Sequence, residues 1–182
     1  MAKITKEHLI LALIFILVVG TRLALVLPQQ SFDYEAYGVL RQAEHIRNTG
    51  LPLYNDPLSY SGRTLVFPPL FEYLLAGFSF LMPLELAAKI IPNLLFASLT
   101  LIIYLIAKQM TKNKAAAMLA AFFSGFVSII YSSTNQVSSY SLALPLIFLL
   151  SYAFLKIDEK GFATWNIILA ILLLLAHPSF FM

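Results

Sequence analysis

The chain has 182 residues, of which 60% are hydrophobic and only 12% are charged, and its mean hydropathy is +0.83. Because a soluble domain carries about 25% charged residues, this composition excludes a disordered chain, a fibrous repeat and a nucleic-acid binder with a basic face, and it indicates an integral membrane protein. The net charge of +3 is too small to suggest nucleic acid as a partner, and the absence of cysteine excludes disulfides, thiolate metal ligands and a cysteine nucleophile.

The first apolar run covers residues 9–27 and follows two lysines, Lys3 and Lys6. As a helix it would be about 28 Å long, close to the roughly 30 Å thickness of a bilayer's hydrocarbon core. A cleaved signal peptide would have a shorter apolar core and a small-residue cleavage site after it, and no such site follows here. We therefore predict an uncleaved transmembrane helix with a cytoplasmic N-terminus.

Residues 28–86 are more polar and are predicted to form one long outer loop. Within it, residues 33–48 have apolar side chains at helical spacing, and Thr49-Gly50 is a typical helix end. An amphipathic helix directly after a membrane span lies most naturally in the plane of the interface. The next segment, residues 51–65, is rich in turn residues and is predicted to be a loop.

The apolar run at residues 67–82 has two possible placements. Between its flanking prolines it would be about 20 Å long as a helix, so it could be a short tilted span or a helix against the membrane surface. The lysine-containing linkers at 108–114 and 156–162 are both cytoplasmic only if this run does not cross. Because basic loops favour the cytoplasmic side, we predict a surface helix.

The remaining apolar runs complete an all-α, polytopic transmembrane bundle. The predicted spans are residues 9–27, 87–107, 115–131, 139–155 and 163–181. They make residues 1–182 a single multi-pass module of the cell membrane. The sequence stops at Met182 within an apolar run that has no charged flank, which indicates part of a longer membrane domain.

Asp33 and Glu35 are the first candidates for chemistry, since they stand two residues apart at the predicted membrane surface. One interpretation is a general base or metal ligand that faces a membrane-embedded substrate. The other is structural, with Asp33 capping the following helix and Glu35 stabilised near its positive end. Spacing alone favours the structural interpretation.

Four other polar residues have paired interpretations. Arg22, inside the outer end of the first span, either snorkels to the headgroups or binds a lipid phosphate, and Arg63 in the loop has the same two alternatives. His177 ends the last leucine-rich run on the same outer side as Asp33, and its structural and functional interpretations are evenly balanced. Tyr37 and its aromatic neighbours are more typical of an interfacial belt than of a sugar platform.

Three segments resemble the start of the GT-C superfamily of membrane glycosyltransferases. They are Ser-Phe-Asp-Tyr-Glu-Ala-Tyr at 31–37, Gly-Leu-Pro-Leu-Tyr at 50–54 and Phe-Pro-Pro-Leu-Phe-Glu-Tyr-Leu-Leu at 67–75. The likeness is closest to protein O-mannosyltransferase and aminoarabinose-transferase-type enzymes, and it covers essentially this whole chain but only the N-terminal module of the family. It implies transfer of a sugar from a polyprenyl-phosphate carrier to an acceptor hydroxyl at the outer face, with inversion.

The same resemblance implies roles for individual residues. Asp33 matches the family's catalytic aspartate, and Glu35 lies near the position where some members have a second acid. The expected substrate-binding residues are Arg22, Tyr37, Arg63, Gln136 and His177. The implied partners are a lipid-linked sugar donor and membrane lipids. Gln136 and nearby serines stand where many members have an acidic residue, which argues against a divalent metal cofactor.

A non-catalytic membrane protein, such as a transporter or flippase fragment or a scaffold, is the alternative. It would place ionisable residues within several spans and break helices near the bilayer midplane. The predicted spans are almost free of charge, which favours the enzyme, whereas Pro92-Asn93 and Pro145 keep the alternative open. The sequence has no glycine-rich phosphate loop, in agreement with a lipid-linked donor.

Overall fold

The computed structural model describes residues 6–58, 62–64, 67–127 and 134–177. In that part of the chain there are seven helices and one two-stranded antiparallel ribbon, so the predicted all-α class is confirmed. The elements are α1 (Lys6–Val26), α2 (Tyr34–Thr49), β1 (Asn55–Asp56), β2 (Arg63–Thr64), α3 (Leu70–Phe78), α4 (Leu84–Thr111), α5 (Lys114–Gly125), α7 (Tyr140–Leu155) and α8 (Phe162–Ala176).

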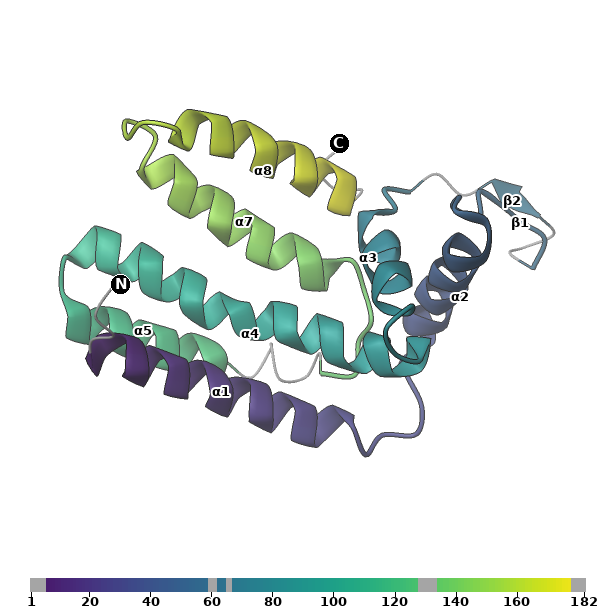
Figure 1. Ribbon diagram of the computed structural model, residues 1–182, viewed down its shortest axis with the longest axis horizontal. Coiled ribbons are helices and arrows are strands. Elements are labelled where there is room, and N and C mark those ends of the chain that lie inside the picture. Colours follow the sequence, from purple (N-terminus) through teal and green to yellow (C-terminus); the bar gives the residue numbers. More distant parts are fainter. Residues whose placement is uncertain (1–5, 59–61, 65–66, 128–133, 178–182) are drawn as a thin grey trace.

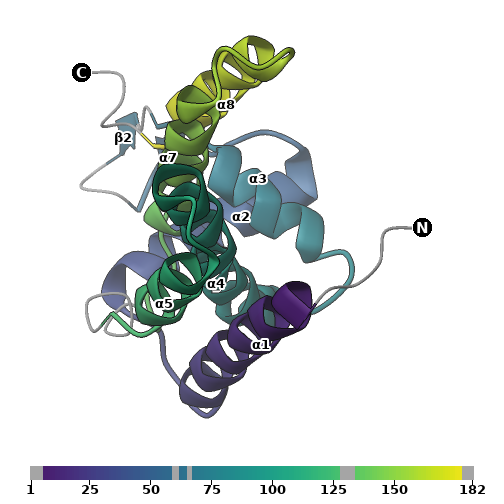
Figure 2. The same ribbon diagram turned by 90° about the vertical axis from the view of Figure 1, so that its left-hand side faces the viewer.

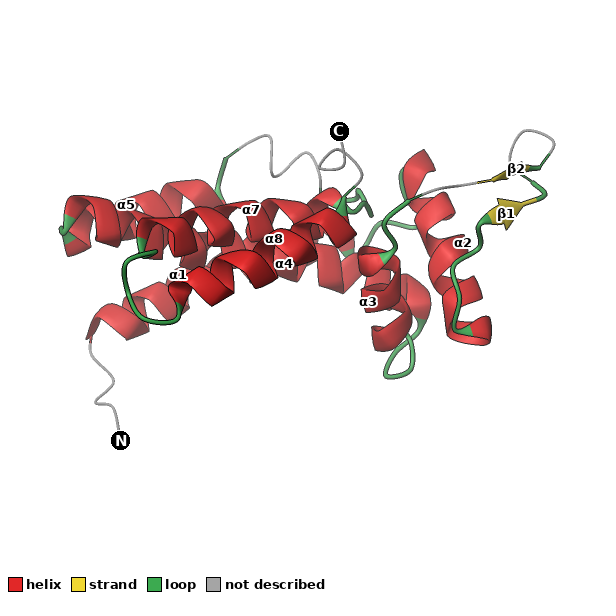
Figure 3. Cartoon of the chain, turned by 90° about the horizontal axis from the view of Figure 1, so that it is seen from above, coloured by secondary structure: helices red, strands yellow, loops and turns green. Residues whose placement is uncertain are grey.

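Five helices, α1, α4, α5, α7 and α8, run side by side and form a bundle (Figure 1). α4 is central, because it packs against α1, α5 and α7, while α8 packs against α7. Seen end-on, α1, α4 and α5 form one group from which α7 and α8 extend (Figure 2). α2, α3 and the ribbon gather at one end, where α2 and α3 run across the direction of the bundle helices (Figure 3).

Local signals in the sequence set several helix ends. α2 stops at Gly50, whose φ of +78° is a left-handed conformation that glycine adopts without a steric penalty, and its N–H donates to the Ile46 carbonyl at 2.7 Å. Asn113 caps the start of α5, and its Oδ1 accepts the N–H groups of Ala115 and Ala116 at 2.9 and 3.3 Å. These caps satisfy backbone groups that a helix end leaves without an internal partner.

Gly125 allows α5 to approach the centre of the bundle. A Cβ atom at this position would overlap the Val18 side chain of α1 and lie 3.0 Å from Cγ2 of Thr100 in α4. Val18 and Thr100 are themselves buried. The three helices therefore meet at a point where only glycine fits without a shift of the neighbouring side chains.

Two helices of the described chain, α1 with 21 residues and α4 with 28, are long and apolar enough to cross a membrane. α5, α7 and α8 are apolar but shorter, with 12, 16 and 15 residues. The ends of two predicted spans, at 128–131 and 178–181, lie outside the described residues. Length and composition thus support two candidate spans, and the predicted five spans are not shown.

The predicted outer loop contains both expected helices and, in addition, a short ribbon. α2 starts and ends within one residue of its predicted limits, while α3 covers only the nine residues from Leu70 to Phe78 of the apolar run. The segment predicted as a loop contains the ribbon, in which Asn55 pairs with Thr64 and Asp56 with Arg63. Two-residue strands are too short for a period-two pattern to reveal them.

Candidate functional site

Asp33 and Glu35 lie at the start of α2, and both side chains are exposed. Asp33 has extended backbone angles, and its Oδ1 accepts the N–H of Tyr34 at 3.0 Å. A typical N-cap side chain accepts from the second or third residue of the helix, so this contact satisfies a different donor. Because Asp33 is exposed, its carboxylate is accessible to a molecule that approaches the start of α2.

Two cavities flank α2 and share Tyr37 and Arg41 as a common wall. The smaller, here called the α2–ribbon cavity, has a volume of about 410 Å³ and is lined by Tyr34, Glu35, Tyr37, Gly38, Arg41, Asp56 and Leu58. The larger, called the α2–α4 cavity, has a volume of about 680 Å³ and lies between α2, the start of α4 and the linker that follows α1. Glu35 and Tyr37 thus line one cavity, and Asp33 stands two residues before Glu35 in the sequence.

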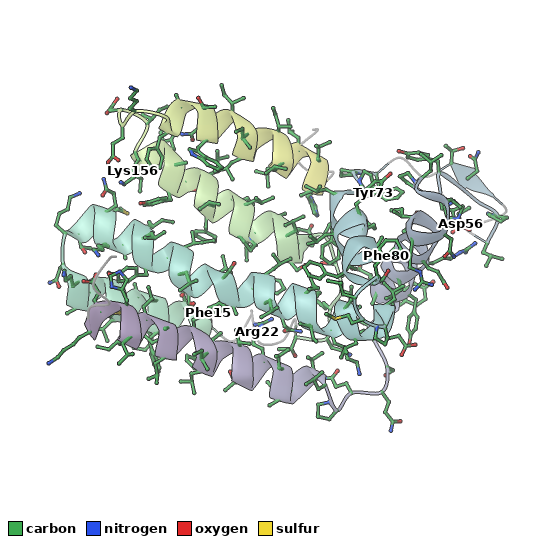
Figure 4. All side chains as sticks on the ribbon, in the orientation of Figure 1. Phe15, Arg22, Asp56, Tyr73, Phe80 and Lys156 are labelled. Atoms are coloured by element: carbon green, nitrogen blue, oxygen red, sulfur yellow. The ribbon has the colours of Figure 1, made fainter. Side chains whose placement is uncertain are left out.

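Polar contacts in and beside the wall of the α2–ribbon cavity hold the surrounding chain in place. Nη2 of Arg41 lies 2.8 Å from Oδ1 of Asp56, which is buried at the start of the ribbon (Figure 4). The Gln42 side chain donates to the Leu53 carbonyl at 3.0 Å and accepts the Leu53 N–H at 2.9 Å. The hydroxyl of Tyr73 in α3 donates to the Gly50 carbonyl at 3.0 Å. These contacts hold the segment after α2 against α2 and α3.

Arg22 is fully buried between α1 and α4, so the snorkelling interpretation is wrong (Figure 4). Its Nε donates to Oδ1 of Asn93 at 3.0 Å, and its guanidinium lies 4.9 Å from the centre of the Phe96 ring. Asn93 follows Pro92, which has no N–H to donate within α4. A planar guanidinium suits both a fixed acceptor and an aromatic face, and these two partners hold it inside the bundle.

A set of hydrogen bonds extends from Asn93 toward the linker that carries Asp33. Nδ2 of Asn93 donates to the carbonyls of Lys89, at 2.8 Å, and Thr134, at 2.9 Å. Nζ of Lys89 donates to the Gln29 carbonyl at 2.5 Å. Nδ2 of Asn135 donates to the Ser31 carbonyl at 3.0 Å. The linker before Asp33 is therefore tied to α4 and to the loop before α7.

The other predicted site residues are more scattered. Gln136 is exposed in the loop before α7, and His177 is buried beside Tyr140, with 4.1 Å between the two ring centres. α8 ends near α3, so His177 lies at the same end of the bundle as α2 (Figure 1). Arg63 belongs to β2, but its side chain lies outside what the structure describes. In the described part of the chain, no three His, Asp or Glu side chains come together as a possible metal site.

Glu72 is a buried acid that sequence reasoning did not single out. Its residue is 6% exposed in α3, and its Oε2 has no hydrogen-bond partner in the described part of the chain. Burial raises the pKa of the Glu72 carboxyl to about 7, although a hydrogen bond from its own backbone N–H acts in the opposite direction. Glu72 therefore titrates near neutral pH.

The sequence-based site omitted Lys89, Asn93 and the Arg41–Asp56 pair. Asn93 had a visible signal, an amide next to a proline in an apolar run. Lys89 and Arg41 looked like ordinary surface charges, and their partners lie 60 and 15 positions away in the chain.

Comparison with family models matches none of them to this chain, and comparison with curated proteins also finds no match. The assignment of a function therefore rests on the residues and their geometry.

Proposed function

We propose that the protein is a membrane glycosyltransferase of the GT-C type, which transfers a sugar from a polyprenyl-phosphate carrier to an acceptor hydroxyl at the outer membrane face. The observation that carries this proposal is the exposed carboxylate of Asp33 at the start of α2. The residues that follow it in the sequence, among them Glu35, Tyr37 and Arg41, line a cavity. Carboxylates, a tyrosine and an arginine supply the hydrogen-bonding groups and the aromatic surface that sugar binding requires.

The exposed surface of the bundle supports a place in the membrane. Leu9, Leu13 and Ile16 of α1 are 67 to 68% exposed in the isolated chain. A soluble protein rarely exposes a row of large apolar side chains along one helix, whereas lipid tails would cover them. α2 and α3 run across the bundle direction (Figure 3), as helices in the interface plane would if the bundle crosses the bilayer.

The charges at the far end of the bundle support the orientation. The start of α1 and the turns α4–α5 and α7–α8 lie at the end opposite to α2 and α3 (Figure 1). There Glu7 lies 2.5 Å from Nζ of Lys108 and 2.6 Å from Nζ of Lys114, while Lys156 pairs with Glu159. Because lysine-rich segments favour the cytoplasm, α2 and Asp33 would face outward.

In the proposed reaction Asp33 acts as general base. It takes the proton of the acceptor hydroxyl as that oxygen attacks the anomeric carbon, and the bond to the carrier phosphate breaks in the same displacement, which inverts the configuration. Arg41 is the cation that lines the cavity beside Asp33, in place of the buried Arg22, and would stabilise the charge that develops on the leaving phosphate.

The substitution Asp33→Asn tests this role. Asparagine caps helices as well as aspartate but cannot accept the proton, so we expect normal folding and a loss of about 10²-fold or more in transfer rate. The rate is measured as polyprenyl phosphate released from polyprenyl-phosphate-linked hexoses and pentoses by protein in liposomes. Glu35→Gln should have a milder effect. Near-normal turnover in Asp33→Asn would show that Asp33 is only a helix cap.

One observation favours the second candidate, a non-catalytic transporter or flippase fragment. Arg22 is a buried arginine that binds Asn93, the residue after Pro92 in the apolar helix α4. Buried charges and prolines within apolar helices are features expected of transport proteins. However, α4 continues through Pro92 without a break, and Arg22 binds α4 itself. Transport of a lipid-linked sugar across liposome membranes that is unaffected by Asp33→Asn would favour this alternative.

A further inference from the structure

Apart from the Tyr37 and Arg41 side chains that it shares with the α2–ribbon cavity, the α2–α4 cavity has no role in the proposed sugar transfer, yet it is large and strongly charged. Its volume of about 680 Å³ lies within the range typical of small-molecule sites. Both helices contribute charges of both signs, with Arg41, Glu44 and Arg47 from α2 and Glu85 and Lys89 from α4. The cavity therefore has separate groups for an anion and for a cation.

Two of the three cations of this cavity, Lys89 and Arg47, have weak or neutral partners, while Arg41 is paired with Asp56 at 2.8 Å. Nζ of Lys89 donates to the carbonyls of Leu27 and Gln29, at 3.4 and 2.5 Å, and lies 5.9 Å from the centre of the Phe32 ring. These partners orient the ammonium group without a counter-charge. Arg47 approaches Glu44 only to 3.8 Å, which is a long contact for an ion pair. Lys89 and Arg47 can thus still bind an anionic group.

The acids disfavour a simple anion as the ligand. Glu44 and Glu85 are exposed and line the same cavity, so a sulfate or a pyrophosphate would meet two negative charges. A simple cation would meet the three basic side chains. A ligand that carries a phosphate and an ammonium group together satisfies both sets of charges.

We infer that the α2–α4 cavity binds a zwitterionic phosphate–ammonium group, such as the phosphoethanolamine headgroup of a phospholipid. The cavity lies at the first turn of α4, one of the two candidate spans, which is the level of the headgroups if α4 crosses the bilayer. This inference uses the proposed membrane placement but not the proposed sugar transfer. A soluble phosphoethanolamine ester presents the same chemistry.

The carboxylates predict the selectivity of the cavity. A primary ammonium donates hydrogen bonds to Glu44 and Glu85, whereas a choline group has no N–H to donate. Phosphatidylglycerol has no ammonium group. We therefore expect phosphatidylethanolamine to bind more tightly than phosphatidylcholine or phosphatidylglycerol, by roughly three- to fivefold, the scale of half-exposed charge pairs.

The test measures which lipids the purified protein retains from micelles that contain the three phospholipids in equal amounts, by native mass spectrometry. Glu44→Gln with Glu85→Gln should abolish the preference for phosphatidylethanolamine over phosphatidylcholine. Glu85→Lys should shift retention toward phosphatidylglycerol. Glu159→Gln, in the turn at the opposite end of the bundle, is the matched control and should bind as the unchanged protein does.

A soluble competitor tests whether the cavity recognises the phosphoethanolamine group without the lipid tails. Displacement of phosphatidylethanolamine by glycerophosphoethanolamine would support recognition of the headgroup itself. Equal retention of the three lipids, or a preference that Glu85→Lys leaves unchanged, would overturn the inference. Asp33→Asn should retain phosphatidylethanolamine normally, so the absence of sugar transfer and the absence of headgroup binding are distinguishable results.

Discussion

Asn93 joins three parts of the chain through a single amide group. Its Oδ1 accepts from Arg22 in α1, and its Nδ2 donates to carbonyls of Lys89 in α4 and of Thr134 before α7. Asn93 is 2% exposed and Arg22 is fully buried. Because buried charges depend strongly on their hydrogen-bond partners, this amide is expected to contribute more to stability than its size suggests.

Asn93→Ala should destabilise the protein by about 3 kcal/mol, since it removes an acceptor from a buried cation. The free energy of unfolding is measured by denaturant titration in detergent. Asn166→Ala is the control, because Nδ2 of Asn166 donates to the Phe162 carbonyl in its own helix at 2.9 Å and its loss should cost about 1 kcal/mol or less. Equal effects of the two substitutions would contradict the role of Asn93.

Glu72 predicts a pH dependence of stability. Its pKa is about 7 when folded and 4.5 in the reference state, so the folded protein binds more protons between these values. The stabilisation is complete below about pH 4.5 and is lost as the pH rises to about 7, with a total change of about 3 kcal/mol. Unfolding measured across this range should show the slope. Glu72→Gln should remove it, whereas Glu85→Gln, at an exposed site, should not.

Sequence reasoning identified single residues better than their partners. It singled out Arg22 because an ionisable residue in an apolar run is unusual, but its acceptor lies 71 positions away. It also selected Asp33, Glu35 and Tyr37, which the structure places together at the start of α2. Pairings across such distances depend on helix packing, which no local pattern encodes.

At the scale of elements, the contact between α1, α4 and α5 depends on Gly125. A side chain there would overlap Val18 and crowd Thr100. Helix packing inside membranes relies on small residues, because lipid offers no hydrophobic force to draw helices together. The fit of α5 is therefore expected to be sensitive to a single added methyl group.

Gly125→Ala should lower the free energy of unfolding by about 1 to 3 kcal/mol, because the added Cβ forces neighbouring side chains to shift. Gly38→Ala in α2 is the matched control, since a Cβ there meets no atom within 4 Å, and it should stabilise the helix by about 0.5 to 1 kcal/mol. Thermal unfolding of both variants measures the difference. Stabilisation by both substitutions would mean that α5 packs less closely.

The predicted elements agree best where a strong local signal ends them. Gly50 stops α2, as glycine does generally, whereas α4 begins at Leu84, three residues before the predicted start of its span. α5 is shorter than its apolar run, because hydrophobicity predicts burial or lipid contact and does not mark where a helix stops. Asp56 of the ribbon binds Arg41 of α2, a contact between elements that no local pattern encodes.

For the whole molecule, the separation of the lysine-containing turns from α2 and α3 predicts the topology. Because the chain has no cysteine, Asp158→Cys and Leu58→Cys each introduce one unique thiol at an exposed turn. In right-side-out membrane vesicles an impermeant maleimide should label Cys at position 58 and not at position 158. Labelling of position 158 from outside would contradict the orientation and the site at Asp33.

The contact between Arg22 and Asn93 has a consequence for how the protein is made. Arg22 is synthesised 71 residues before the amide that it binds. In the proposed membrane setting, α1 enters the bilayer with a cation whose insertion costs up to about 2.5 to 3.5 kcal/mol at a helix centre. α4 supplies the acceptor only when it emerges from the ribosome. We therefore expect α1 to stay beside the insertion machinery until α4 arrives, and the two helices to be released into the lipid as a pair.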